Sequence, residues 1–336
     1  MTSPNTAPLA GVRLIAVERF GAGPYATGHF ADLGADVIRI EHVNGGLDAA
    51  RATGPTFLGE HDSVYYQSFN GNKRSLSLDL KSDAGREVLE RLIATADGLI
   101  DNLRGDQPDK LKLTYDHVKA SNPKIVCAHI SAYGREDERR GWPGYDYLMQ
   151  AEAGFLSMTG EPDSPPSRFG LSMVDFMTGM TAAFALLAGI MAARSSGAGR
   201  DVDVSLYDVA MHQLTYPAAW YLNDGLVTGR FARSSHPYAV PSQLCKTADG
   251  WIFLMCQTQK FWRILCERME RPDLAVDPRF IDEESRHHNR EAITELLDDA
   301  LSSQTTAAWI ELLAGEVPCG PVYDIAQALD NPYFVR

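Results

Sequence analysis

The sequence predicts an α/β protein, with a Rossmann-like, doubly wound parallel sheet followed by a second, smaller α+β domain. Short apolar runs of strand character alternate with helical patterns through roughly the first 200 residues, which is typical of βαβ units. A glycine-rich turn, residues 20–24, joins the first strand pattern to the first helix pattern, as in Rossmann-type sheets. From about residue 226 this alternation gives way to a hairpin and helices.

The elements of the first domain are predicted from apolar runs between turn signals and from apolar residues at helical spacing. The expected strands are residues 11–17, 37–40, 76–80, 98–100, 125–130 and 202–206. The expected helices are residues 25–33, 83–96, 115–120, 147–153, a long apolar helix ending at 194, and 207–221. Pro217 is expected to kink the last helix, because proline removes a helix hydrogen bond.

The second domain is predicted from a β-hairpin and the helices after it. The Asp249-Gly250 turn signal places the hairpin strands at residues 243–247 and 251–256. Helices are expected at residues 261–269, 283–301 and 306–313, and an extended segment at 317–322. The predicted domains are residues 1–225 and 226–322, with residues 323–336 as the start of a return to the large domain in a chain that ends early.

Composition restricts the classes of function. Of the 336 residues, 45% are hydrophobic and 22% are charged, the balance of a globular protein with a substantial core. A net charge of −13 argues against nucleic acid or an anionic membrane as partner. The five cysteines form no CxxC pair, so they predict neither a disulfide framework nor a zinc site. No signal-peptide pattern is present, and the longest apolar run, residues 182–193, is too short to span a bilayer; we expect a cytoplasmic protein.

The glycine-rich first turn does not predict a nicotinamide site. Gly21 and Gly23 lack the third glycine that the GxGxxG fingerprint requires.

Residues 168–180 contain the main candidate for chemistry. Asp175 lies between Val174 and Phe176, at the start of the long apolar helix pattern. Burial disfavours the charged form of a carboxylate, whereas N–H groups at a helix start favour it. Such a carboxylate is a nucleophile, a general base or a simple N-cap, and this stretch alone leaves the three open.

Two polar turns are candidates for ligand contacts. Asn72, Lys73 and Arg74 form a turn before a strand, and residues 101–105 follow directly after another strand. Adjacent cations suit a phosphate, and open α/β sheets bind ligands beyond their strand ends. A solvated turn is the alternative for the Lys-Arg pair.

Nine segments, taken together and in this order, resemble the class III CoA-transferase (CaiB/BaiF) family over essentially the whole chain. They are GVRLIAVERFGAGP, LGADVIRIE, FNGNKRSLSLDL, ADGLIDN, PGYD, MVDFMTGM, GAGRDVDVSLYDV, TADGWIFL and VPCGPV. The resemblance implies a large Rossmann-like domain, a small domain and an interlocked homodimer. It also implies an acyl-CoA:carboxylate CoA-transferase whose substrate is acyl-CoA, with no permanently bound cofactor and no metal.

The resemblance also implies roles for individual residues. Asp175 is the expected nucleophile, which attacks the thioester to give an acyl–aspartyl anhydride and then an aspartyl-CoA thioester. Asp146 is the second expected catalytic residue, with an N-cap of helix 147–153 as the open alternative. The residues expected to bind CoA are Phe20, Gly21, Arg39, Asn72, Lys73, Arg74, Asn102, Leu103 and Arg104. Members of the family commonly carry Arg-Pro directly after the position of Glu41, and this chain does not. Arg39 is therefore included as a substitute for that arginine.

Two other functions stay open. A racemase acting on α-methylacyl-CoA pairs a histidine with an aspartate, but Tyr145 precedes Asp146 here and tyrosine is a poor proton shuttle at neutral pH. His129, in an apolar strand, is expected to be a satisfied core residue. The other function is a non-catalytic CoA-binding module.

The sequence does not identify the donor and acceptor acids of the expected transferase, although Arg168, Arg233 and His236 suit the second carboxylate of a dicarboxylic acid.

Overall fold

The computed structural model describes residues 7–43 and 47–335, and the chain divides into two compact units. The first unit comprises Met1–Phe155 and Arg168–Asn223, and the second comprises Leu156–Ser167 and Asp224–Arg336. The sequence placed residues 156–167 in the large domain and residues 323–336 at the start of a return to it; the structure groups both with the second unit. Glu161 in the first of these segments accepts hydrogen bonds from Arg233 N at 3.0 and 3.1 Å.

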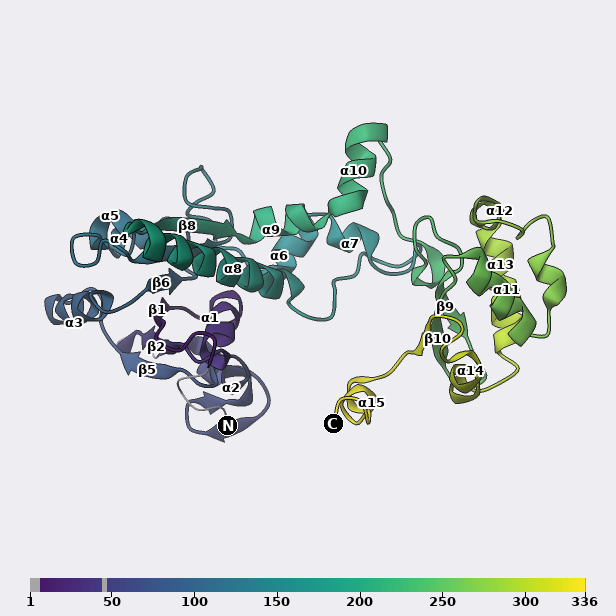
Figure 1. The fold of residues 1–336 in the computed structure, drawn as a ribbon, viewed down its shortest axis with the longest axis horizontal. Helices are drawn as coiled ribbons and strands as arrows, with labels where there is room; N and C mark the ends of the chain where they lie inside the picture. Colours follow the sequence, from purple (N-terminus) through teal and green to yellow (C-terminus); the bar gives the residue numbers. More distant parts are fainter. Residues whose placement is uncertain (1–6, 44–46, 336) are drawn as a thin grey trace. The chain divides into compact units, whose positions relative to one another are not determined.

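The first unit contains a six-stranded parallel sheet in the order β5-β2-β1-β6-β7-β8 (Figure 1). Its strands are β1 Arg13–Val17, β2 Asp36–Glu41, β5 Arg74–Ser77, β6 Gly98–Asp101, β7 Val126–Ser131 and β8 Arg200–Ser205. All five neighbouring pairs are parallel. The strand order reverses between β1 and β6, and this arrangement confirms the predicted doubly wound α/β class.

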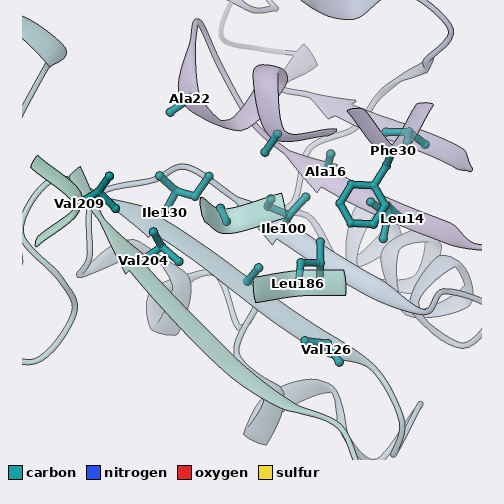
Figure 2. Packing of buried hydrophobic residues seen from close by; sticks show 14 of the residues in the cluster. Leu14, Ala16, Ala22, Phe30, Ile100, Val126, Ile130, Leu186, Val204 and Val209 are labelled. Carbon is teal, nitrogen blue, oxygen red and sulfur yellow. The ribbon is translucent and has the colours of Figure 1, made fainter. Parts of the chain in front are cut away.

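Successive residues of the central strands point to opposite faces of the sheet, and each face has its own apolar core. Leu14 and Ala16 of β1 pack into the cluster that contains Ile100, Val126 and Leu186 (Figure 2). Ile15, between them, packs into the cluster on the other face. Burial on both faces explains why these strands read as continuous apolar runs.

The helices that lie between the strands or follow the last of them are α1 Ala22–Asp32, α2 Val64–Asn70, α3 Asp83–Ile93, α4 Gln107–Lys110, α5 Tyr115–Val118, α6 Asp146–Glu152, α7 Phe155–Met158, α8 Met173–Ser196, α9 Leu206–Gln213 and α10 Thr215–Asp224. Neither α7 nor α10 has a buried residue, and most of α7 belongs to the second unit. A short 3-10 helix, η2 Ala49–Ala52, and a small hairpin, β3 Phe57–Gly59 with β4 Asp62–Ser63, precede α2.

Helix α8 is the central core helix of this unit. It packs against α1, α9, β7 and β8, with Ala182, Leu186 and Ile190 buried. Its 24 residues are, by length and composition, long and apolar enough to cross a membrane, which applies to no other helix in the described residues. The sequence analysis counted only residues 182–193, which are half of this helix, and buried core helices pass the same test of length and composition.

The second unit contains an antiparallel sheet in the order β11-β10-β9 with helices against it. The strands are β9 Ser242–Lys246, β10 Trp251–Met255 and β11 Cys319–Pro321. The helices are η3 Ala232–Ser234, α11 Gln259–Arg268, η4 Pro272–Ala275, α12 Glu283–His288, α13 Arg290–Leu301, α14 Thr306–Leu313 and α15 Ile325–Leu329. Trp262, Phe280 and Leu297 lie in its buried core.

Two predicted helices are each divided in the structure. The predicted helix 207–221 is α9 and α10, separated at Leu214, so Pro217 lies in the first turn of α10, where proline is tolerated. The predicted helix 283–301 is α12 and α13, because Asn289 leaves the helical conformation with φ −108° and ψ 30°. Strand β5 is also shifted, beginning at Arg74 rather than at residue 76.

Candidate active site

A cleft of about 670 Å³ opens in the first unit at the carboxyl ends of β1 and β6. These two strands are the ones between which the strand order reverses, the position at which open α/β sheets bind ligands. The lining includes residues 17–22 after β1, residues 102–104 after β6, residues 142–145 before α6, and Asp175 at the start of α8.

Asp175 occupies the first turn of α8, and its carboxylate lies against Gly21. The N-cap of α8 is Ser172, so the N-cap alternative for Asp175 was wrong. A Cβ atom built on Gly21 would lie 2.6 Å from Asp175 Oδ2, which is closer than real Cβ contacts. The turn after β1 therefore needs glycine at position 21 so that the carboxylate can reach the cleft.

Asp146 holds the start of α8 from a neighbouring helix. Its Oδ2 accepts a hydrogen bond from Asp175 N at 2.9 Å. The first N–H groups of a helix have no partner within the helix, so Asp146 satisfies one of those of α8. The alternative of an N-cap for its own helix was wrong, because α6 begins at Asp146 and its N-cap is Tyr145.

The environment of Asp175 favours a proton on its carboxylate. Burial, and then the charge of Asp146, raises the pKa of Asp175 to about 7. Burial also raises the pKa of Asp146, although hydrogen bonds from Asp175 N and Gln150 oppose this. Among residues 7–43 and 47–335, no hydrogen bond to the Asp175 side chain is present to stabilise its charge. A carboxylate with such a pKa changes its charge near neutral pH, as catalytic groups often do.

The turn that carries Phe20 and Gly21 is held on two sides. Asn102 accepts a hydrogen bond from Arg19 N at 2.8 Å and donates one to Arg19 O at 2.7 Å. Asp48 accepts a bond from Phe20 N at 3.3 Å, and Phe20 has the left-handed φ of 54°. These contacts fix the backbone immediately before Gly21.

Arg39 lies beneath this turn and is buried. Its guanidinium forms ion pairs with Asp48 and with Glu18 and Glu41, the latter two at 3.7 and 3.5 Å. The structure thus places Arg39 as the partner of the carboxylate that holds Phe20, and not among the described residues lining the cleft.

The turn before β5 is also placed away from the described lining of the cleft. Asn72 donates to Asp32 at 2.9 Å, and Arg74 forms an ion pair with Asp36 at 2.7 Å. Lys73 is buried, and its Nζ contacts Glu18 Oε1 at 3.0 Å and Pro24 O at 2.8 Å. All three side chains are engaged by protein groups, so their assignment to CoA stays a prediction.

The cleft contains basic residues that the sequence analysis did not select. Arg19, His42 and Lys81 line it together with the predicted Arg104. Each of the four lies a few residues beyond the carboxyl end of a parallel strand: β1 for Arg19, β2 for His42, β5 for Lys81 and β6 for Arg104. Applying the strand-end rule to every strand, rather than to β6 alone, would have found them.

His129 lies outside the cleft lining and is satisfied in the core, as expected. It bridges Asp101 at 2.6 Å and Asp201 at 3.0 Å. Burial lowers its pKa, but the charge of Asp101 and the two hydrogen bonds outweigh burial and raise it to about 9. Across the described part of the chain, His, Cys, Asp and Glu side chains form no cluster suited to a metal ion.

The fold is that of a Rossmann-like α/β protein, with a cleft at the switch point of its sheet. The chain belongs to CoA-transferase family III, whose model matches residues 9–336. This confirms the predicted family and that the protein is an enzyme of the CoA-transferase class.

Individual relatives agree with the family match. The chain is 34% identical to a succinate–glutarate CoA-transferase of Agrobacterium fabrum, covering 97% of this chain and 82% of the relative. It is 32% identical to a succinyl-CoA:mesaconate CoA-transferase of Haloarcula hispanica, covering 97% and 83%. Among solved structures, a CaiB/BaiF family protein from Brucella suis superimposes with a TM-score of 0.86 at 31% identity, covering 98% of this chain and 87% of the other.

Proposed function

We propose that this enzyme transfers CoA from an acyl-CoA donor to a free carboxylic acid, with Asp175 as the nucleophile. The observation that carries the proposal is the position of the Asp175 carboxylate, which lies in the cleft against the bare Cα of Gly21 and has a pKa of about 7. Membership of CoA-transferase family III and the printed activities of the relatives support the reaction class.

In the proposed first half-reaction, Asp175 attacks the thioester carbonyl carbon. The C–S bond breaks, CoA leaves as a thiolate, and an acyl–aspartyl anhydride forms. The thiolate then attacks the aspartyl carbonyl, which releases the donor acid and leaves an aspartyl-CoA thioester. In the second half the acceptor carboxylate attacks this thioester, the thiolate attacks the new acyl group, and the Asp175 carboxylate is restored.

The first proposed step requires Asp175 to be ionised and correctly placed, because its free carboxylate is the nucleophile; in the later steps the side chain is acylated. Asp146 holds the backbone of Asp175 at 2.9 Å, and its charge contributes to the raised pKa of the nucleophile. Developing oxyanions are assigned to backbone N–H groups at the start of α1, next to Gly21, because a helix N-terminus favours negative charge.

The CoA moiety is proposed to lie in the 670 Å³ cleft. Arg104, Arg19 and Lys81 supply positive charge for its phosphates, and Phe20, Gly21 and Leu103 supply the surface for the rest of the molecule. Asn102 and Arg39 act indirectly, because they hold the backbone of Arg19 and the carboxylate of Asp48.

The acceptor is proposed to be a small dicarboxylic acid, with Arg168 binding its distal carboxylate. Arg168 stacks over the ring of Tyr147 at 4.3 Å and donates to Phe169 O and Gly170 O. Its charge opposes the rise in the pKa of Asp146 that burial causes, but it is not among the causes of the shift at Asp175. The guanidinium thus lies near the site without neutralising the nucleophile, and the relatives are named for succinate, glutarate and mesaconate.

The experiment is thioester exchange: protein, succinyl-CoA and glutarate are mixed, and new acyl-CoA is detected by mass spectrometry. Wild type should form glutaryl-CoA, and Asp175→Asn should not, because the amide keeps the shape but is a far weaker nucleophile. Hydroxylamine should trap a hydroxamate at residue 175 in the wild type. Exchange in Asp175→Asn, or labelling at Asp146, would refute the proposed nucleophile. Deuterium uptake at the α-carbon without new acyl-CoA would indicate a racemase instead.

A homodimer and a cytoplasmic location are proposed as well. Met180, Phe184 and Met191 expose apolar surface on α8, which a second copy would cover. The five cysteines are unpaired in the structure, as in proteins of reducing compartments. Light scattering that gives a monomer mass at micromolar concentration would contradict the dimer.

A further inference from the structure

Gln150 of α6 is a buried amide that joins this helix to residues 169–171, the segment that leads into α8. Its side chain is fully buried. Nε2 donates to Asp146 Oδ1 at 2.5 Å and to Leu171 O at 3.3 Å, and Oε1 accepts from Phe169 N at 2.9 Å. The nitrogen and the oxygen of the amide are therefore both engaged, by Asp146 and by the segment that leads into α8.

The spacing of Gln150 and Asp146 makes this contact possible. Both lie on α6, four residues apart, and residues at this spacing are neighbours on one helix face. Gln150 occupies Oδ1 of Asp146, and Oδ2 accepts from Asp175 N. The two oxygens of one carboxylate thus join a buried amide to the backbone of the proposed nucleophile.

We propose that Gln150 is a positioning residue for CoA transfer, which acts by orienting the Asp146 carboxylate that holds Asp175. This inference rests on the proposed role of Asp175 as nucleophile. Gln150 itself does not line the described cleft, so it acts through Asp146 and not on the substrate.

The chemistry of the position requires an amide. The side chain donates to a carboxylate and to a carbonyl and accepts from Phe169 N, and a neutral amide supplies both donor hydrogens and the acceptor without adding charge. A lysine has no acceptor, and an ionised glutamate has no donor.

Tyr65 and Arg168 also lie near the Asp146/Asp175 pair, whose protonation is the readout. Tyr65 of α2 lies close enough to Asp175 for the carboxylate to contribute to the raised pKa of the phenol, after burial. Arg168 acts on Asp146. Neither contacts Gln150 in the described hydrogen bonds, so substitutions at 150 reach the pair through Asp146.

The first test is Gln150→Met, which keeps the length and removes the hydrogen bonds. We expect kcat to fall by roughly 10- to 100-fold, since small displacements of reacting groups cost this much, while KM for acyl-CoA changes little. The acid limb of kcat/KM should move to higher pH, because loss of the donor makes the Asp146/Asp175 pair bind its first proton more readily.

The second test is Gln150→Glu, which also serves if Gln150→Met does not fold. A protonated carboxyl has one O–H, so it still donates to Asp146 and accepts from Phe169 N but leaves Leu171 O without this donor, whereas the ionised form cannot donate at all. Activity should therefore be lost again at high pH, giving an alkaline limb that wild type lacks. A purely structural role would change the melting temperature without creating this limb.

The matched control is Asn122→Leu. Asn122 makes the same kind of contacts at the amino end of β7, to Ile93 O at 2.9 Å, Ala96 O at 2.7 Å and from Lys124 N at 3.1 Å. It should lose stability but keep the wild-type pH profile. In addition, Asp146→Asn/Gln150→Met should be no slower than Asp146→Asn, because the two residues act in series.

The inference is overturned if the Gln150 variants behave like Asn122→Leu, or if the double variant shows additive losses. A ¹³C NMR titration of aspartate carboxyl groups separates this result from failure of the proposed function. If wild type transfers no CoA, the proposed function fails, yet a shifted Asp175 titration in Gln150→Met still supports the positioning role. An unshifted titration refutes it.

Discussion

The Cα of Gly21 and the carboxylate of Asp175 are in direct contact, and a methyl group on Gly21 would lie 2.6 Å from Asp175 Oδ2. The first residue belongs to the turn after β1 and the second to the first turn of α8. This contact brings together two segments that are far apart in the sequence, and it can be tested without changing the carboxylate itself.

Gly21→Ala should impair catalysis while leaving the fold intact. Gly21 has φ −100°, so alanine is compatible with the backbone, but its Cβ would displace the carboxylate. We expect kcat to fall by roughly 100-fold with CoA binding measurable by calorimetry. Gly28→Ala, on the same helix with its nearest neighbour at 3.6 Å, is the control and should be fully active. Equal activity of the two variants would show that Asp175 is not constrained at this contact.

Activity should rise with pH through about 7. Burial first, and then Asp146, raises the pKa of Asp175 to about 7, and the ionised form is the nucleophile, so kcat/KM should be low below this pH and reach a plateau above it. The free energy of unfolding depends on pH with the opposite sign. Because the folded-state pKa of Asp175 is raised, its contribution to stability is fully present below the unfolded-state pKa and is lost as pH rises through about 7. Asp146→Asn should move the acid limb to lower pH, and an unmoved limb would exclude the electrostatic role of Asp146.

Arg104 and Arg74 provide a matched pair for locating the CoA phosphates. Both are exposed arginines near an aspartate, Asp106 and Asp36 respectively, but only Arg104 lines the described cleft. Arg104→Ala should raise KM for acyl-CoA by about threefold to tenfold, as expected for a partly exposed ion pair, with kcat retained. Arg74→Ala should leave both constants unchanged. A larger effect at Arg74 would restore its sequence-based assignment to CoA.

Lys73→Met should lower stability more than it alters kinetics. The side chain of Lys73 is 2% exposed and its ion pair with Glu18 is buried, so its removal leaves Glu18 with less compensation at a cost of about 3 kcal/mol or more. Chemical denaturation measures the loss. The exposed pair Lys119 and Asp116 supplies the control, Lys119→Met, which should leave the free energy of unfolding close to the wild-type value. A raised KM in a stable Lys73→Met would instead support direct contact with CoA.

Local patterns in the sequence were sufficient for the fold class. The alternation of apolar strands with helical patterns predicted the parallel sheet, because burial on both faces leaves a continuous apolar signature within each strand. The same patterns misplaced breaks inside helices. Asn289 interrupts the predicted helix 283–301 without any glycine or proline at the break, so the sequence carried no signal there. At the other break a signal was present, because α9 ends at Gln213, four residues before Pro217, and a proline removes the helix hydrogen bond to that residue.

The sequence by itself determined the family and the candidate nucleophile, since the motif around Asp175 and the residues of the strand-end turns lie in short contiguous segments. Only the tertiary structure decided that Asp146 and Gln150 of α6 hold the start of α8, that Gly21 makes room for the carboxylate, and that Lys73 is engaged by Glu18. The physical reason is that a hydrogen bond or ion pair depends on which elements meet in space. Periodicity and turn chemistry act over a few neighbouring residues, and they carry no information about partners that lie tens of residues away.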